Sequence, residues 1–151
     1  MEGHGPVAEG TNIILFNSDE HVLMYLRDDK PEIPYPGMWS LLGGMVEAGE
    51  TPQECILREL YEEIGLRLDP NRVRHFRTRQ LDGELTEHTF VATVDLDLTR
   101  VTLTEGQALR WFSADDIQRT TLAYGDNALL DDFFTALRAE RQANPSDFSP
   151  R

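Results

Sequence analysis

The sequence predicts one mixed domain of the α+β or α/β class, built from β-hairpins and a few helices rather than from regular βαβ units. Its 151 residues, 40% of them hydrophobic, are enough to bury one core. Strand-like segments are separated by short polar turns, and two stretches show the apolar spacing of helices. We therefore expect a single domain over residues 1–151, with an ordered core at about 7–142.

The first part of the chain predicts a hairpin, a loop and a buried strand. Two apolar strands at 7–17 and 21–27 are joined by a polar turn. The segment 28–37 carries three prolines and a terminal glycine, which favours a shaped surface loop. Residues 38–42 form a short apolar strand that should end at Gly43-Gly44, where the backbone can take conformations closed to other residues.

The clearest helix signal lies at Thr51 to Ile64. Thr51 and Glu54 form the pattern of a capping box, and Pro52 falls at the first helical position. Gly65 follows the last helical residue and supplies the left-handed conformation that commonly ends a helix. This segment is therefore predicted to be helical, with both ends marked.

The second half predicts a further hairpin and two helices. Strands at 72–80 and 84–98 flank Asp82-Gly83, a dipeptide suited to a tight turn, and 109–112 is another short strand. Ser113 can cap a brief helix through Ile117. Asp126 or Asn127 begins a final helix that turns several apolar side chains inward: Leu129, Leu130, Phe133, Phe134 and Leu137. The tail after Asn144 should be loose.

The charge balance restricts the partners of the chain. With 14 basic and 27 acidic residues the net charge is −13, which opposes binding to a nucleic acid backbone and means that a phosphorylated substrate needs a cationic mediator. The single cysteine, Cys55, cannot form an internal disulfide, which fits a reducing compartment, and we expect a cytoplasmic protein. No stretch approaches a membrane span, so no membrane partner is expected.

Three glutamates are predicted to share one stripe of the first helix. Glu59, Glu62 and Glu63 are spaced i, i+3 and i+4, beside an apolar arc that the helix can bury. Such a row is usually only a solvated face. Like charges at this spacing repel, however, and a divalent cation among them would remove the conflict. Carboxylates without nearby histidines suit a hard ion such as Mg²⁺.

The wider spacing favours the metal site. Gly44 to Leu66 reads GMVEAGETPQECILRELYEEIGL and fits G-x5-E-x7-R-E-U-x-E-E-x-G-U at every fixed position, where U is aliphatic. In this the chain resembles the Nudix hydrolase family. The resemblance implies a Nudix α/β/α sandwich, in which a mixed central sheet is flanked by this helix and the C-terminal helix.

The resemblance also implies roles for residues of the motif. Glu59, Glu62 and Glu63 would bind metal together with the Gly44 carbonyl, and Glu62 and Glu63 would act in catalysis. The family counterparts of Arg58 and Glu50 pair to hold the loop against the helix, so we count Arg58 with the catalytic set in this supporting role and Glu50 as structural. Gly65 is interpreted as a helix cap, also structural.

Outside the motif the resemblance implies fewer residues. Glu105, in Thr104-Glu105-Gly106-Gln107, resembles a later acidic position that many members use as a metal ligand or as the base that activates water; Asp115 or Asp116 are alternatives. Four residues are candidate substrate contacts, each with a structural alternative: Arg27 as an exposed strand-end arginine, Tyr35 and Trp39 as packing aromatics, and Asn127 as a helix cap.

The resemblance implies Mg²⁺-dependent hydrolysis, with Mn²⁺ as a substitute, of a diphosphate linkage in a nucleoside triphosphate or modified nucleotide. The products would be a nucleoside monophosphate and pyrophosphate. Hydrolysis of another nucleoside diphosphate linked to X, such as a nucleotide sugar or dinucleotide polyphosphate, is the alternative, and a non-catalytic nucleotide-binding module is a third hypothesis. The protein is expected to be a monomer or a homodimer.

Three departures from the common family pattern bear on the site. Leu41-Leu42 precedes the glycines where many members have a proline, and Met45 takes a place that is often basic or polar. Neither position touches the carboxylates. Cys55 stands where alanine is usual, and we interpret it as a small buried residue rather than a nucleophile.

Overall fold

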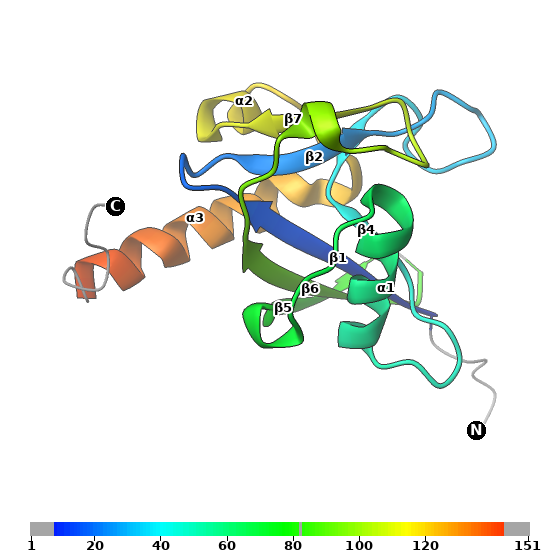
Figure 1. Cartoon of the computed structure of the whole chain (residues 1–151), viewed down its shortest axis with the longest axis horizontal. Coiled ribbons are helices and arrows are strands. Elements are labelled where there is room, and N and C mark those ends of the chain that lie inside the picture. Colours follow the sequence, from blue (N-terminus) through cyan, green and yellow to red (C-terminus); the bar gives the residue numbers. More distant parts are fainter. Residues whose placement is uncertain (1–7, 82, 144–151) are drawn as a thin grey trace.

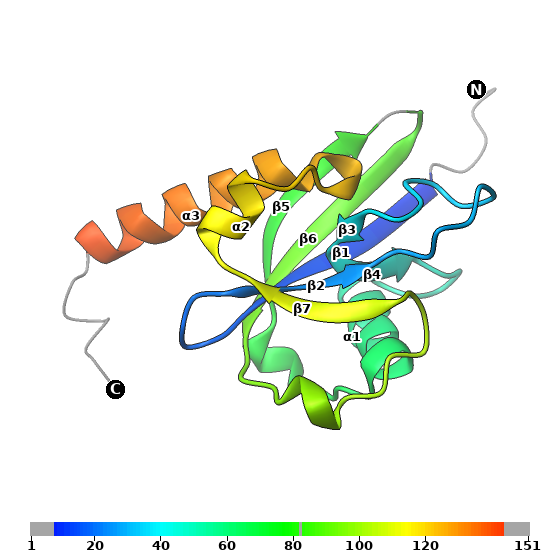
Figure 2. The ribbon, with the colours of Figure 1, turned by 90° about the horizontal axis from the view of Figure 1, so that it is seen from above.

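A computed structural model describes residues 8–81 and 83–143, and in it two helices cover opposite faces of one sheet (Figure 1 and Figure 2). Helix α1 spans Pro52–Ile64 and helix α3 spans Asp126–Ala143. The strands are β1 Ala8–Phe16, β2 Val22–Leu26, β3 Trp39–Ser40, β4 Leu42–Met45, β5 Arg74–Leu81, β6 Leu85–Thr93 and β7 Ala108–Phe112. The expected α/β/α sandwich is confirmed.

The sheet is mixed. Its strands follow the order β3-β2-β1-β6-β5, with β4 also paired to β1 and β7 to β2. β1 and β6 run parallel along their whole length, and the other pairs are antiparallel. β1 is buried on both faces because its apolar side chains alternate: Ile13 and Leu15 pack in the core under α1, whereas Ile14 and Phe16 pack in the core under α3.

The predicted hairpin of β1 and β2 exists, but its strands pair only at Phe16 and Val22, next to the turn. Beyond that point the antiparallel partner of β1 is β4, and β2 pairs instead with β3 and β7. The two strands therefore separate, and the candidate site opens between them. A sequence pattern that marks a hairpin does not reveal this divergence.

The prediction that a strand ends at Gly43-Gly44 was wrong. Both glycines lie inside β4, where they pair with Asn12 and Thr11 of β1. A side chain at position 43 would place its Cβ 2.0 Å from the Thr11 carbonyl oxygen, so this strand can approach β1 only as glycine. The predicted 38–42 strand is also split at Leu41, whose backbone N–H donates to a carboxylate oxygen of Asp126 at 3.3 Å.

The signals at the ends of α1 are confirmed. The Thr51 side chain accepts from the Glu54 backbone N–H, the Glu54 side chain accepts in return from Thr51, and Pro52 is the first helical residue. Gly65 takes the left-handed conformation at φ 70°, and its N–H bonds to the Tyr61 carbonyl. The helix therefore starts and stops where local chemistry predicts.

The second hairpin and the later helices are also confirmed, with shifted bounds. β6 ends at Thr93 rather than at residue 98, because the chain then turns into a 3-10 helix at Leu98–Arg100 that Asp97 caps. β5 starts later than predicted, after a 3-10 helix at Pro70–Arg72. Ser113 caps α2, Ala114–Gln118, and a third 3-10 helix, Ala123–Gly125, precedes α3. Asp82 and the predicted loose tail lie outside the described residues.

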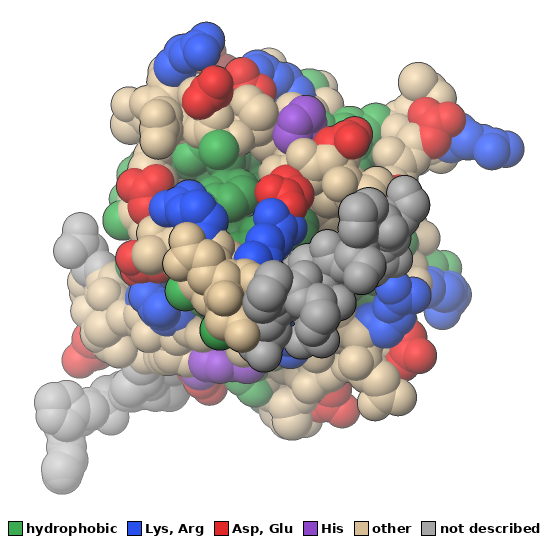
Figure 3. All heavy atoms as spheres, turned by 90° about the vertical axis from the view of Figure 1, so that its left-hand side faces the viewer, with side chains coloured by type: hydrophobic (Ala, Val, Ile, Leu, Met, Phe, Trp, Pro, Cys, Tyr) green, Lys and Arg blue, Asp and Glu red, His purple; other side chains and the backbone are tan. Residues whose placement is uncertain are grey.

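One face of the described surface is mixed in charge. On the face shown in Figure 3, basic side chains are interspersed with acidic ones around an apolar hollow rather than gathered in one basic patch. Among the described residues, no helix has the length and apolar character needed to cross a membrane.

Candidate active site at the end of helix α1

The three glutamates of α1 differ in exposure although they share one stripe. The Glu63 residue is buried, with 4% of its surface exposed, and the Glu59 side chain is 16% exposed. The Glu62 side chain is 57% exposed. This gradient follows from packing, because Ile56, Leu60 and Ile64 anchor the neighbouring face of α1 on the sheet. One carboxylate is thus forced inward and one faces solvent.

Arg58 joins the loop before α1 to two of these glutamates. Its Nε and Nη2 donate to the carboxylate of Glu50 at 2.6 and 3.0 Å, a bidentate ion pair. Its Nη1 donates to Glu59 at 3.0 Å and to Glu62 at 3.1 Å. The hydrogen bonds from Arg58 lower the pKa of Glu50 to about 2, so this carboxylate stays charged. The geometry matches the pairing that the resemblance implies for Glu50 and Arg58.

Gly44 brings β4 against the carboxylate row. A Cβ at this position would lie 2.2 Å from the carboxyl carbon of Glu59, so only glycine leaves room for that side chain. The Gly44 carbonyl accepts a hydrogen bond from the Thr11 hydroxyl at 3.1 Å, and the Cys55 sulfur lies 3.8 Å away. Burial raises the pKa of the Cys55 thiol to about 11, which supports a packing role rather than a nucleophilic one.

Glu63 lies in an uncompensated environment. Its Oε1 atom is buried without a hydrogen-bond partner. Burial, together with the nearby carboxylates of Glu59, Glu105 and Glu62, raises the pKa of Glu63 to about 9. Burial also raises the pKa of Glu59. A buried acceptor among carboxylates is the arrangement that a cation would relieve.

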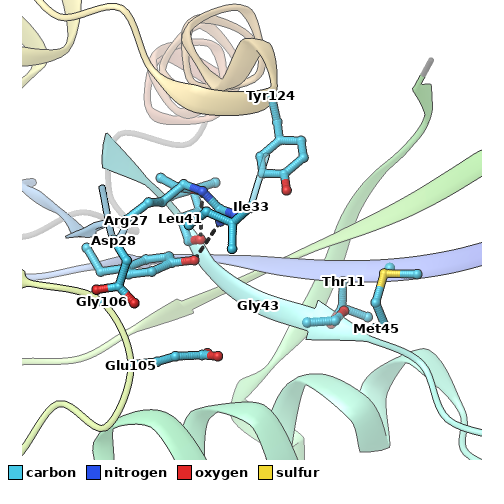
Figure 4. A pocket seen from close by; sticks show the side chains of 14 residues that line it. Thr11, Arg27, Asp28, Ile33, Leu41, Gly43, Met45, Glu105, Gly106 and Tyr124 are labelled. Atoms are coloured by element: carbon cyan, nitrogen blue, oxygen red, sulfur yellow. Dashed lines mark hydrogen bonds between the residues drawn. The ribbon is translucent and has the colours of Figure 1, made fainter. Parts of the chain in front are cut away.

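A cavity of about 270 Å³ opens beside this row. Its wall includes Gly44 of β4, Glu105 from the loop before β7 and Arg27 after β2. Figure 4 shows Glu105 and Arg27 in this wall. Arg27 is held in place, because its Nε donates to the Pro34 carbonyl at 2.9 Å and its Nη1 to the Tyr25 hydroxyl at 2.7 Å. The cavity wall thus combines Arg27 with the carboxylates of Asp28 and Glu105, and Gly44 links it to Glu59 on α1.

Sequence reasoning missed two aromatic residues of the cavity, Tyr25 and Tyr124. Burial raises the pKa of Tyr25 to about 12, which keeps its hydroxyl neutral and able to donate. The Tyr124 ring lies 5.3 Å from the Arg27 guanidinium carbon, and its backbone has φ 60°. A left-handed non-glycine residue beside a charged cavity is a signal that only coordinates provide.

The remaining candidate substrate contacts do not line this cavity. Tyr35 packs against Tyr124 at 4.5 Å between ring centroids and borders a neighbouring cavity of about 330 Å³. Trp39 is half-buried against Phe112. The Asn127 side-chain amide is hydrogen-bonded within the fold: its oxygen accepts from the Leu122 N–H, and its nitrogen donates to two backbone carbonyls. The structural alternatives thus account for Asn127 and Trp39, and their roles as substrate contacts stay predictions.

Asp115 and Asp116, the alternatives to Glu105, lie in α2 and not at the cavity. The Asp116 side chain accepts from the Ser113 backbone N–H at 3.0 Å and pairs with Arg110. It completes the capping box of α2, which explains its presence without a catalytic role. Glu105 is the acidic residue of this region that reaches the cavity.

Comparison with known proteins identifies the family. The family model of the NUDIX domain matches residues 7–133. The chain belongs to the Nudix family.

Among Nudix relatives, the CTP pyrophosphohydrolase of Escherichia coli is 32% identical over 108 residues, which are 72% of this chain and 78% of that protein. An uncharacterized Nudix hydrolase of Pseudomonas aeruginosa is 44% identical over 68 residues, 44% of this chain and only 40% of its own length. The crystal structure of a MutT protein from Methanosarcina mazei superposes with a TM-score of 0.72 at 21% identity, covering 89% of this chain and 98% of that one. It supports the fold.

Nudix hydrolases generally need a divalent metal ion, and the residues of this site fit one. The donor set is carboxylate and carbonyl oxygen, which suits a hard cation, and the partnerless Oε1 of Glu63 is available. Within residues 8–81 and 83–143, no three aspartate, glutamate, histidine or cysteine side chains are gathered closely enough to hold a metal ion as they stand. Mg²⁺ keeps several waters and does not require such a cage.

Proposed function

We propose that this Nudix protein hydrolyses a diphosphate linkage in a nucleoside triphosphate or modified nucleotide, dependent on Mg²⁺, with release of a nucleoside monophosphate and pyrophosphate. The observation that carries the proposal is the buried Oε1 of Glu63, which has no partner and is surrounded by other carboxylates. In a protein of net charge −13, this row of carboxylates would repel the phosphates of a substrate unless cations lie between the carboxylates and the phosphates.

Glu59, Glu62, Glu63 and the Gly44 carbonyl would hold the metal, with Glu105 as a further ligand or as the base. When bound, the ion neutralises charge on the bridging phosphate oxygens and lowers the pKa of a coordinated water. Glu105 or Glu63 accepts a proton from the attacking water. The oxygen of that water bonds to phosphorus, the phosphoanhydride bond breaks, and the nucleoside monophosphate leaves.

Arg27 would contact the phosphates. Its guanidinium is fixed by Pro34 and Tyr25 before any ligand arrives, so little side-chain entropy is lost on binding. The neutral Tyr25 hydroxyl, which accepts from Arg27, retains its own proton for a phosphate oxygen. Tyr124 supplies an aromatic wall, and Tyr35 supports it by packing.

The E. coli relative is named a CTP pyrophosphohydrolase, and it supports a nucleoside triphosphate as the substrate class. Hydrolysis of a nucleotide sugar or a dinucleotide polyphosphate is the alternative within the same chemistry. A binding-only module is disfavoured, because degenerate modules often lose a glutamate of the motif, and this chain keeps all three together with Arg58.

The test is a nucleotide panel assayed with Mg²⁺ and with a chelator, with products identified by mass. We expect a monophosphate and pyrophosphate from at least one triphosphate, and a loss of at least about 100-fold in kcat for Glu62→Gln or Glu63→Gln. Nucleotide binding without product would favour the binding module. Full activity in chelator, or in the double variant that combines Glu62→Gln with Glu63→Gln, would refute the mechanism.

A further inference from the structure

The segment from Thr104 to Gln107, which carries Glu105, is tied at its first residue to the end of α1. The Thr104 backbone N–H donates to the Glu63 carbonyl at 3.0 Å. The Thr104 hydroxyl donates to the Glu62 carbonyl at 2.9 Å and lies 3.3 Å from that of Glu63. Carbonyls in the last turn of a helix lack partners within the helix, so one threonine satisfies two of them.

The same segment is tied at its last residue to the end of β2. The Gln107 backbone N–H donates to the Leu26 carbonyl at 2.8 Å, and its side-chain amide donates to the Arg27 carbonyl at 2.8 Å. Gly106 makes this approach possible. Its φ is +82°, and a Cβ there would lie 2.7 Å from the Tyr25 ring. The segment is therefore pressed against the strand that presents Tyr25 and Arg27.

Glu105 lies between these two attachments. Its residue is exposed, and it lines the cavity on the side of Arg27 (Figure 4). An exposed carboxylate on a free loop would sample many positions, whereas catalytic groups need to be held within about 0.5 Å of the productive geometry. The attachments reach the backbone of Glu62 and Glu63 on one side and of Arg27 on the other.

We propose that Thr104 and Gln107 are positioning residues for Glu105: their hydrogen bonds to α1 and β2 hold the Glu105 carboxylate toward Glu63 at the mouth of the cavity. The inference rests on the proposed function, because it assumes that Glu105 takes part in the reaction. It assigns to Thr104 a role that differs from packing, since valine has the same shape and lacks only the hydroxyl.

The test compares Thr104→Val with Thr104→Ser, which keeps the hydroxyl, and with Glu105→Gln as the reference. Thr102→Val, an exposed position on the same loop outside the attachments, is the matched control. We expect Thr104→Val to lower kcat about tenfold with KM changed less than about twofold, because misplacing a reacting group costs rate rather than affinity. Thr104→Ser should restore kcat, and Thr102→Val should match the parent.

A second measurement needs no metal or substrate. Hydrogen exchange of the backbone amides of Thr104 and Gln107, followed in chelator, should be faster in Thr104→Val and unchanged in Thr104→Ser. Gln107→Leu should speed exchange at Thr104 less than at Gln107, because it removes only the side-chain hydrogen bond at the β2 end. Unchanged exchange in Thr104→Val would overturn the inference.

The outcomes separate this inference from the proposed function. If Glu105→Gln loses activity while Thr104→Val keeps the parental kcat, the proposed function stands and the positioning role is refuted. If product forms only with Mg²⁺ and Glu105→Gln is as active as the parent, Glu105 has no role and the inference falls alone. If no variant or parent gives product, the proposed function itself fails.

Discussion

The ionisation of a single residue, Glu63, links the candidate site to the stability of the folded protein. In the metal-free protein its pKa is raised from 4.5 to about 9 by burial and neighbouring carboxylates, whereas the unfolded chain has the ordinary value. A carboxyl with a raised folded-state pKa contributes stability that is fully present below pH 4.5 and is lost as the pH rises toward 9. The acidic site therefore makes the folded protein less stable in mild alkali.

Glu63→Gln tests this coupling, because the amide stays neutral at every pH. In chelator, the thermal midpoint of the variant relative to the parent should rise between pH 5 and pH 9, by about 2–4 °C if about 1 kcal/mol is recovered. Glu62→Gln, at a 57% exposed side chain, should show a smaller change and serves as the control. A constant difference in thermal midpoint between Glu63→Gln and the parent from pH 5 to pH 9 would show that the ionisation of Glu63 does not lower the stability.

The sequence predicted the residues of the site that are close together in the chain. Glu59, Glu62 and Glu63 share a helix, and Gly44 precedes them in one motif, so spacing alone groups them. Tyr25 and Tyr124 come from distant segments, and nothing in their local pattern marks them. The contacts of Asn127 could not be predicted either, because its amide donates to the carbonyls of Ile117 in α2 and Thr120 after it, an arrangement that no sequence pattern specifies.

Helix α1 is the element on which the site depends, and its N-terminal cap is built from Thr51, Pro52 and Glu54. Thr51→Ala removes the hydroxyl acceptor for the Glu54 N–H and should cost about 1 kcal/mol, or about 2–4 °C in the thermal midpoint. Thr51→Ser should retain the parental value. Because the cap lies at the far end of α1 from Glu63, kcat should change less than about twofold. A tenfold loss of kcat in Thr51→Ala would mean that the cap positions the carboxylates.

Elements were predictable where their signals are local. The caps of α1 and α2 are each set by a few neighbouring residues. The place of β4 was not predictable, because it depends on two glycines meeting β1 across the sheet and on the Leu41 N–H meeting Asp126, 85 residues later. Separation of β1 from β2 is likewise non-local, and it opens the cavity.

At the scale of the whole molecule, two apolar cores on either side of the sheet hold the site at its edge, whereas length and composition predicted only that the chain can bury one core. The layered arrangement followed from the family resemblance rather than from the pattern of apolar residues. The net charge of −13 was predictable from composition, and it produces a negative electrostatic potential around the site. That field attracts metal cations and repels nucleotides.

The same field should therefore give opposite salt dependences for the two ligands. Mn²⁺ binding without nucleotide, measured by electron paramagnetic resonance, should weaken about tenfold between about 20 and about 300 mM KCl, because screening shortens the reach of the negative charges. Nucleotide binding in chelator should strengthen over that range. Removing two charges on α3 with Asp131→Asn and Glu140→Gln, both exposed, should weaken Mn²⁺ binding only at the low-salt end, because the Debye length falls from about 20 Å at about 20 mM to about 6 Å at about 300 mM salt. Mn²⁺ affinity that ignores salt would show that the carboxylate row acts by contact alone, without help from the molecular charge.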